Sequence, residues 1–386
     1  MVTGIDALAA GALAAGVTWG LTPLSARVAR RLGAIDEPRD RGLADRPTPR
    51  LGGLAICAGV LLAGVLWLPL REPWKAVLAA ALFITLFGAL DDIFDLPPFV
   101  KLAGQVAAAW IVAHEGARVD NFTLPFIHRV DLSTTVAEIV TILGLVLIMN
   151  AVNFSDGVDG LAAGVCAIAA ASFAVIAFDI PVATAPSAPI AGALSAIVAG
   201  ASVGFLAWNF YPARVFMGDS GSNLLGLLLG CVAVLGTVKT SALVGLIAPL
   251  VILAVPFLDT TFVVLKRMKY RRPITGADAN HFHHRFSRIG FSQRRTVAYL
   301  YAWTSTLAGA ALGLRFVPYT DRHGHFHLGW TLVMAAILLV ALAASVYLVY
   351  VLEILKVRRR FRRETEEQVA RRLETGEFEA IPRPRA

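Results

Sequence analysis

The sequence predicts an all-α, polytopic integral membrane protein with about eleven transmembrane helices. A count of ten is also compatible with the sequence. Three features of composition and one of patterning predict this class. The chain of 386 residues is 57% hydrophobic and only 16% charged, and its mean hydropathy is +0.67. These values lie outside the range of an ordinary soluble domain. Apolar stretches long enough to cross a bilayer recur along the chain, so a membrane-embedded helical bundle is expected.

The expected spans are stretches of about 20 mostly apolar residues, the length that a helix needs to cross the hydrocarbon core. No basic segment of a cleaved signal peptide precedes the first stretch, so we interpret it as a retained helix. The segment DIPVATAPSAP favours a turn between two spans, and the span at 76–90 is short, which leaves the count between about ten and about eleven. The expected spans cover residues 5–26, 51–70, 76–90, 100–117, 134–152, 161–180, 188–209, 221–238, 242–265, 296–315 and 329–352.

The distribution of the 35 Lys and Arg residues predicts the orientation of the chain. When the connecting segments are assigned alternately to two sides, 28 of these residues fall on one side and 7 on the other. The positive-inside rule places the richer side in the cytoplasm, so the N-terminus is expected outside and the C-terminus inside. Residues 1–352 then form a single transmembrane domain, and the charged segment 353–386 is a cytoplasmic tail against anionic lipid headgroups.

Five polar motifs fall on this predicted cytoplasmic side. The first, residues 36–53, is a basic loop rich in proline and glycine that includes Arg50. Such a loop suits phosphate groups, and a loop that only sets the topology is an equal alternative. Its glycine pair, Gly52 and Gly53, favours a close approach of backbone at the start of a helix.

The second motif, GALDDIFDLPPFVK, contains Asp91, Asp92 and Lys101. Adjacent carboxylates at the end of a helix repel each other unless they share a cation or a proton, so a divalent metal is a natural partner. The alternative is a helix that simply ends in solvent. Negative charge is unfavourable at the C-terminal end of a helix, which favours the functional interpretation.

The third motif, NAVNFSDGVDGLA at residues 150–162, lies between two long apolar segments. Asn150, Asn153, Asp156 and Asp159 recur at intervals of three, which places side chains on one face if the flanking helices continue into the motif. A simple turn needs only one Asn-Gly or Asp-Gly pair. Four polar side chains at regular spacing therefore indicate a site.

The fourth motif, FMGDSGSNLLG, contains Asp219. It does not fit the nucleophile pattern G-x-S-x-G, because position 222 is Ser. Small residues around an aspartate before a helix favour a metal ligand beside a phosphate-binding helix N-terminus.

The fifth motif, at residues 271–295, holds a histidine tract next to arginine. It has no cysteine partner and no H-E-x-x-H pattern, which argues against zinc. Imidazoles beside arginine suit an anionic ligand such as phosphate, and a surface histidine cluster is the alternative. The candidate residues are His281, His283, His284 and Arg285.

Together the five motifs offer oxygen ligands for one or two Mg²⁺ ions and basic groups for phosphate oxygens. This combination is typical of phosphoryl transfer, and its position at a membrane surface predicts a lipid phosphate and a soluble nucleotide derivative as substrates. A transporter is disfavoured, because its charged residues would lie near the bilayer midplane in two related halves. The CDP-alcohol phosphotransferases are disfavoured too, because their Asp-Gly-x-x-Ala-Arg pattern is missing after Asp156.

The motifs, in this order and over nearly the whole chain, resemble the polyprenyl-phosphate N-acetylhexosamine-1-phosphate transferase family (glycosyltransferase family 4). The matching segments are PTPRLGG (47–53), Asp91-Asp92 with Lys101, NAVNFSDGVDGLA (150–162), GDSGS (218–222), FLDTTF (257–262) and HFHHR (281–285). The resemblance implies a Mg²⁺-dependent enzyme, for which Mn²⁺ would also serve. It moves a sugar-1-phosphate from a UDP-N-acetylhexosamine to undecaprenyl phosphate, releasing UMP, at the cytoplasmic face of the plasma membrane.

The resemblance also implies roles for single residues. Asn153 and Asp219 would bind Mg²⁺, and Asp91 and Asp92, helped by Lys101, would bind or deprotonate the lipid phosphate. The nucleotide or sugar end would be held by Asp156 and Asp159. Arg50, Asn150 and the histidine motif would bind substrate, and Asp259 would support the site from within the ninth span. Both direct attack by the lipid phosphate and a two-step route through an aspartyl-phosphate fit these residues.

The His-x-His-His-Arg form of the fifth motif is similar to the branch of the family that uses UDP-N-acetylglucosamine for cell-envelope glycans. The sibling branch, the phospho-N-acetylmuramoyl-pentapeptide transferases of peptidoglycan synthesis, usually has Pro-x-His-His-His there and is the alternative. The expected partners are therefore the two substrates and the bilayer, with no nucleic acid; a homodimer is compatible with the sequence.

Overall fold

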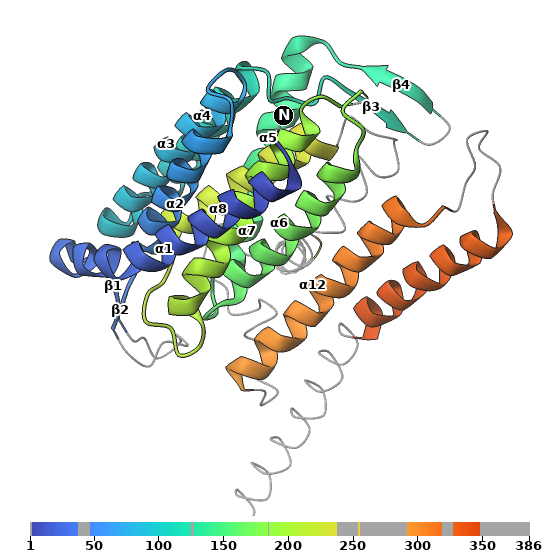
Figure 1. Cartoon of the computed structure of the whole chain (residues 1–386). Coiled ribbons are helices and arrows are strands. Elements are labelled where there is room, and N and C mark those ends of the chain that lie inside the picture. Colours follow the sequence, from blue (N-terminus) through green and yellow to red (C-terminus); the bar gives the residue numbers. More distant parts are fainter. Residues whose placement is uncertain are drawn as a thin grey trace, which may run out of the picture.

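The computed structural model describes residues 2–37, 47–124, 127–183, 185–237, 254, 292–318 and 327–347, and their arrangement is drawn in Figure 1. Within these residues the chain is almost entirely helical. The strands found there form two short antiparallel hairpins, β1 (Ile35–Asp36) with β2 (Thr48–Pro49) and β3 (Asn121–Leu124) with β4 (Ile127–Asp131). The predicted all-α class is confirmed.

Ten of the eleven expected spans coincide with a helix, and the eleventh, 242–265, lies outside the described residues except for residue 254. Eight of the described helices are long and apolar enough to cross a membrane, so the protein is a polytopic membrane protein. The orientation of the chain stays a prediction. The helices are α1 (Gly4–Leu32), α2 (Gly52–Trp67), α3 (Trp74–Phe94), α4 (Pro98–His114), α5 (Thr134–Ser155), α6 (Leu161–Asp179), α7 (Ala188–Asn209), α8 (Gly218–Val232), the π-helical η1 (Ala233–Thr237), α12 (Gln293–Phe316) and a helix at Leu328–Tyr347.

The first helix illustrates how local sequence sets the ends of these elements. At its start the Thr3 hydroxyl accepts a hydrogen bond from the backbone N–H of Asp6, and the Asp6 carboxylate accepts one from the N–H of Thr3. This reciprocal capping box satisfies two N–H groups that the helix leaves unpaired. At its end Gly33 adopts φ of 74° and donates its N–H to the carbonyl of Ala29, which stops the helix.

Helix α8 lies at the centre of the bundle (Figure 1). It packs against α3 on one side and α5 on another, while α1 packs against α7 and α2. Of the most apolar stretch within Gly218–Gly236, which covers α8 and residues of η1, 83% is buried, compared with 11% for that of the helix Leu328–Tyr347 at the edge. The outer faces of α3 and α5 expose leucines such as Leu86 and Leu143, as expected of surfaces that contact lipid tails.

The contact between α3 and α8 depends on a small residue at position 88. A Cβ atom added to Gly88 would lie 2.6 Å from both the Cα and the backbone nitrogen of Ser220, in the first turn of α8. These are main-chain atoms, so they cannot turn aside as a flexible side chain does. Gly88 therefore permits the approach that brings the end of α3 to the start of α8.

We predict that Gly88→Ala lowers the melting temperature in detergent and reduces activity, because α3 and α8 must separate to accept the methyl group. Gly144→Ala is the matched control, since nothing lies within 4 Å of a Cβ atom at that position on α5. It should keep the parental melting temperature or raise it, as alanine is the better helix former by about 1 kcal/mol. Equal melting temperatures for Gly88→Ala and the parent protein would refute the close-packing argument.

Candidate active site

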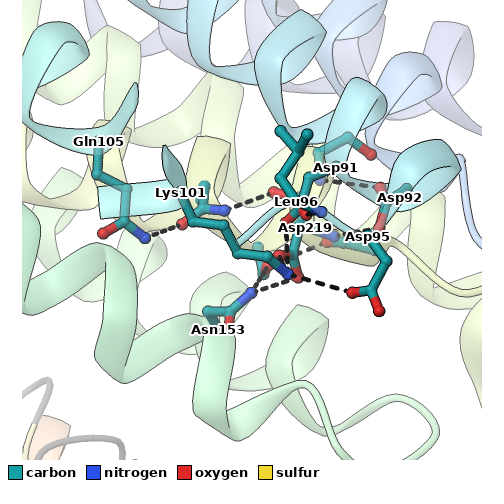
Figure 2. A network of polar contacts seen from close by, with 12 residues as sticks. Asp91, Asp92, Asp95, Leu96, Lys101, Gln105, Asn153 and Asp219 are labelled. Carbon is teal, nitrogen blue, oxygen red and sulfur yellow. Dashed lines mark hydrogen bonds and ion pairs between the residues drawn. The ribbon is translucent and has the colours of Figure 1, made fainter. Parts of the chain in front are cut away.

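The C-terminal end of α3 and the start of α4 hold Asp91 and Lys101 together (Figure 2). Asp95 ends α3 with φ of 49°, and the short turn that follows brings α4 back alongside α3. The Asp91 carboxylate is buried, and both of its oxygens have partners. Oδ1 accepts a hydrogen bond of 2.9 Å from the N–H of Leu96, and Oδ2 lies 2.8 Å from the Lys101 Nζ. Asp91 therefore fixes the position of the Lys101 ammonium group.

Asp92 is bonded to the start of α8. Its carboxylate accepts hydrogen bonds from the backbone N–H groups of Asp219, at 2.8 Å, and of Ser220, at 3.1 Å. These N–H groups belong to the first turn of α8, where they have no partner within the helix. A carboxylate at this position is also favoured by the helix dipole. Asp92 thus occupies the N–H groups that were predicted to bind phosphate.

Gly218, the first residue of α8, allows this bond to form. It adopts φ of 69°, a left-handed conformation that side chains with a Cβ atom disfavour. A Cβ atom there would also lie 2.6 Å from the Asp92 Oδ1. Both observations explain why glycine precedes Asp219 in the GDSGS motif.

Asp219 lies where α3, α4, α5 and α8 meet (Figure 2). Its Oδ1 accepts a hydrogen bond of 2.8 Å from the Asn153 amide, and its Oδ2 lies 3.5 Å from the Lys101 Nζ. The Asn153 amide also donates to the Ser222 hydroxyl at 2.8 Å. The side chain of Asp219 is 28% exposed, so one part of the carboxylate is held by protein while another part can meet a ligand.

The second half of the NAVNFSDGVDGLA motif is a loop bonded to the segment between α7 and α8. Asp159 accepts a hydrogen bond of 2.8 Å from the N–H of Ala213. The buried Asn209 joins the same two segments, because it accepts from the N–H of Gly160 and donates to the carbonyl of Val215, both at 3.0 Å. The Tyr301 hydroxyl of α12 donates to the carbonyl of Gly160. Helices α7 and α12 and the segment between α7 and α8 thus hold this loop in place.

Asp156 is the least satisfied carboxyl of the cluster. It is half-buried, and within the described residues no hydrogen-bond donor reaches its side chain. Burial raises the pKa of the Asp156 carboxyl well above its ordinary value. The neighbouring carboxylates, Asp219 first among them, raise this pKa further, and the positive charge of Arg50 opposes them. A cation that bound near Asp156 would be stabilised by the same carboxylates.

Arg50 belongs to a segment that runs beside the start of α8. The N–H groups of Gly52 and Gly53 donate to the carbonyls of Phe216 and Met217, at 3.0 and 2.9 Å. This confirms the close backbone approach that was predicted for the glycine pair. The Arg50 guanidinium forms an ion pair with Asp36. As it lies in the structure, Arg50 is at the border of the carboxylate cluster rather than inside it.

The oxygen ligands of the cluster fit the way in which Mg²⁺ usually binds. In the part of the chain that the structure describes, no three His, Cys, Asp or Glu side chains are grouped as a preformed metal site. Mg²⁺ rarely needs such a cage, because it keeps several waters and takes one or two carboxylates together with substrate phosphates. Asp219, with Asn153 beside it and the carboxyl of Asp156 nearby, provides that kind of donor set.

The structure brings together most of the residues that the sequence singled out. Asp91, Asp92, Lys101, Asn153, Asp156 and Asp219 lie at neighbouring helix ends, with Asp159 and Arg50 at the border. Asn150 bonds to Gln105 and to the carbonyl of Val146 rather than to these residues. The residues His281, His283, His284, Arg285 and Asp259 lie outside the described residues.

Sequence reasoning missed four polar residues next to the cluster. They lie within or at the ends of apolar helices, where an amide or hydroxyl side chain is costly unless it is paired. That cost is the signal in the sequence that points to them. The missed residues are Gln105, Asn209, Ser222 and Asn223.

Comparison with known proteins decides the family. The family model described as glycosyl transferase family 4 matches residues 74–237, a range that contains every clustered residue except Arg50. The chain is 37% identical over 284 residues to a probable undecaprenyl-phosphate N-acetylglucosaminyl 1-phosphate transferase of Bacillus subtilis, covering 73% of this chain and 77% of that protein. The chain belongs to glycosyl transferase family 4.

Two further relatives carry names that differ in the group transferred. A decaprenyl-phosphate N-acetylglucosaminephosphotransferase of Mycobacterium leprae is 35% identical over 337 residues, covering 80% of this chain and 84% of that protein. A phospho-N-acetylmuramoyl-pentapeptide-transferase of Desulforudis audaxviator is 34% identical over 343 residues, covering 80% of this chain and 98% of that protein. The resemblance inferred from the motifs is thereby confirmed.

We predict that Asn209→Leu destabilises the protein and reduces its activity. The substitution leaves the N–H of Gly160 and the carbonyl of Val215 buried without their partner, at about 1–3 kcal/mol for each unpaired group. Ser202→Ala on the same helix is the matched control, because the Ser202 hydroxyl is buried and has no hydrogen-bond partner within the described residues. Melting temperatures in detergent separate the two variants; an equal loss in both would show that Asn209 has no special role in holding the loop.

Proposed function

We propose that this protein transfers N-acetylglucosamine-1-phosphate from UDP-N-acetylglucosamine to undecaprenyl phosphate, producing a lipid-linked pyrophosphoryl sugar and UMP for cell-envelope glycan synthesis. The observation that carries the proposal is the polar cluster around Asp219, at the meeting point of four apolar helices. Its carboxylates and the ammonium group of Lys101 suit a substrate pair rich in phosphate. The names of the two N-acetylglucosamine-1-phosphate transferases to which the chain is 37% and 35% identical support the choice of sugar and of a polyprenyl acceptor.

In the proposed reaction, an oxygen of the lipid phosphate forms a bond to the β-phosphorus of the UDP-sugar. The bond between that phosphorus and the bridging oxygen breaks, and UMP leaves with the oxygen and its electron pair. Protein groups mainly position the two phosphates and neutralise their charge. These bond changes describe direct attack by the lipid phosphate. A two-step route through an aspartyl-phosphate gives the same net reaction.

The geometry supports a division of roles within the cluster. Lys101 is the cationic group placed to meet a phosphate oxygen, and Asp91 holds it there through their 2.8 Å ion pair. Asp92 positions α8 through two backbone bonds, which refines the role in phosphate binding that the sequence had suggested. Asp156 and Asp159 remain the proposed contacts for the nucleotide or sugar end.

We assign Asp219 and Asn153 as the residues that would hold Mg²⁺. The ion, when bound, would neutralise charge on the phosphate oxygens. The Asn153 Nδ2 donates to the Asp219 Oδ1 at 2.8 Å, so the two side chains are adjacent, and the Asn153 Oδ1 would be the atom that binds the ion. Mn²⁺ has similar ligand preferences and would serve in place of Mg²⁺.

The cluster is proposed to face the cytoplasm. This side carries 28 of the 35 Lys and Arg residues when the chain alternates across the membrane, and UDP-sugars are soluble nucleotides. For this alternation to hold, four helix ends must lie on one side of the membrane: the end of α3, the start of α4, the end of α5 and the start of α8. Their side chains are in contact, in support of the alternation.

A second candidate is transfer of phospho-N-acetylmuramoyl-pentapeptide, the activity named for the relative of Desulforudis audaxviator, of which the chain covers 98%. Both candidates use the same acceptor and release UMP, so they share the cluster and differ in the sugar donor. The choice between them rests on donor preference.

Incubation of the purified protein with undecaprenyl phosphate, Mg²⁺ and each UDP-sugar tests the proposal. UMP release and a sugar pyrophospholipid are expected with UDP-N-acetylglucosamine, and preference for UDP-N-acetylmuramoyl-pentapeptide would select the second candidate. Asp219→Asn should abolish turnover while the protein keeps its melting temperature, whereas Asp120→Asn, at the opposite ends of the helices, should remain active. No product with any donor, or a fully active Asp219→Asn, would overturn the proposal.

A further inference from the structure

Three amide side chains form a continuous chain directly beneath the cluster. The Asn150 Nδ2 donates to the Gln105 Oε1 at 2.7 Å, and the Gln105 Nε2 donates to the Asn223 Oδ1 at 2.8 Å. The Asn223 Nδ2 then donates to the backbone carbonyl of Asp219 at 2.9 Å. Gln105 and Asn223 are each 6% exposed. Part of this amide chain is drawn in Figure 2, beside Lys101 and Asn153.

The spacing along the sequence places each amide one turn below a residue of the cluster. Gln105 follows Lys101 by four residues on α4, and Asn223 follows Asp219 by four residues on α8. Asn150 precedes Asn153 by three residues on α5. Residues three or four apart lie on the same face of a helix. Each of the three helices thus carries one cluster residue and, one turn deeper, one amide of the chain.

The two ends of the amide chain determine how every amide is oriented. Both ends bond to main-chain carbonyls. At one end Asn223 donates to the carbonyl of Asp219, and at the other Asn150 donates to the carbonyl of Val146 at 2.8 Å. A carbonyl only accepts, so Asn223 and Asn150 must each present their NH₂ group to it. Asn223 therefore presents its oxygen to Gln105, and Gln105 presents its own oxygen to Asn150. One arrangement satisfies all of these bonds.

The position of the amide chain in an apolar bundle makes it a strong constraint on the three helices. Water is scarce at this depth, so an amide that loses its partner leaves a polar group in apolar surroundings. If one helix rotated or slid by a fraction of a turn, at least one of the bonds would break. Chains of this kind fix a single arrangement when all members are satisfied.

We infer that Gln105, Asn150 and Asn223 are positioning residues that lock α4, α5 and α8 in register, and so hold Lys101, Asn153 and Asp219 in the geometry needed for phosphoryl transfer. The inference rests on the proposed transferase activity. It also moves Asn150 from substrate binding, as the sequence suggested, to support of the site. The three residues reach the substrate only through the cluster above them.

The test compares Gln105→Met, Asn223→Leu and the double variant with the parent protein in the UMP-release assay. Each single substitution should lower kcat by roughly 10- to 100-fold, the usual effect of removing a group that supports a site. The KM for UDP-N-acetylglucosamine should change by less than about twofold, because no substrate contact is lost. The double variant should be no slower than the slower single variant, since either substitution already breaks the chain.

Thr141→Val on α5 is the matched control, because Thr141 is equally buried and bonds to the carbonyl of Ala137 far from the cluster. It should lower the melting temperature while kcat stays at the parental value. If Gln105→Met does not fold, Asn150→Leu, at the less buried end of the amide chain, gives the same comparison.

Parental kcat in a folded Gln105→Met, or losses that multiply in the double variant, would overturn the inference. So would a loss of kcat in Thr141→Val as large as that in Gln105→Met, which would indicate a general effect of stability. An inactive parent protein would instead refute the proposed function, so the two failures are distinguishable.

Discussion

The bond between the Asp92 carboxylate and the first N–H groups of α8 is the interaction on which the rest of the site depends. It joins the end of one helix to the start of another through charge-assisted hydrogen bonds of 2.8 and 3.1 Å. The carboxylate meets the positive end of the α8 dipole. Because Asp219 contributes one of the two N–H groups, the same bond sets the direction in which its side chain leaves the helix.

The other contacts of the cluster follow from this fixed point. Once α8 is held against α3, Asp219 can reach both Asn153 on α5 and Lys101 on α4. Lys101 is in turn held by Asp91, the neighbour of Asp92 in the sequence. The adjacent aspartates therefore have different tasks: one organises a cationic side chain, and the other organises a helix. Small residues at Gly88 and Gly218 leave room for this arrangement.

Much of the fold could be predicted from the sequence, because a bilayer permits few solutions. A helix that crosses it needs a long apolar run, and such runs are visible without any knowledge of packing. The gathering of the motifs also followed from a simple count of basic residues, which placed the ends of α3 and α5 on the same side as the start of α8. The histidine motif stays a prediction, as do the orientation of the chain and the metal.

The partners of individual side chains could not be predicted, because they depend on packing between segments distant in sequence. Nothing in the DD pair says that Asp91 binds a lysine ten residues later while Asp92 bonds to α8. Asn150 and Asn153 look equivalent in the motif, yet Asn153 bonds to Asp219 of the carboxylate cluster and Asn150 bonds to Gln105. The single buried amides on α4 and α8 carry little signal by themselves, and their meaning is apparent only when the three helices meet.

Hydrogen–deuterium exchange of the segment 218–222 tests the central claim most directly. The parent protein should protect the amides of Asp219 and Ser220, which are bonded to Asp92. In Asp92→Asn, one acceptor oxygen is replaced by a donor, so exchange should become faster in this segment while peptides from α7 remain as protected as in the parent. Equal protection of 218–222 in both proteins would contradict the account.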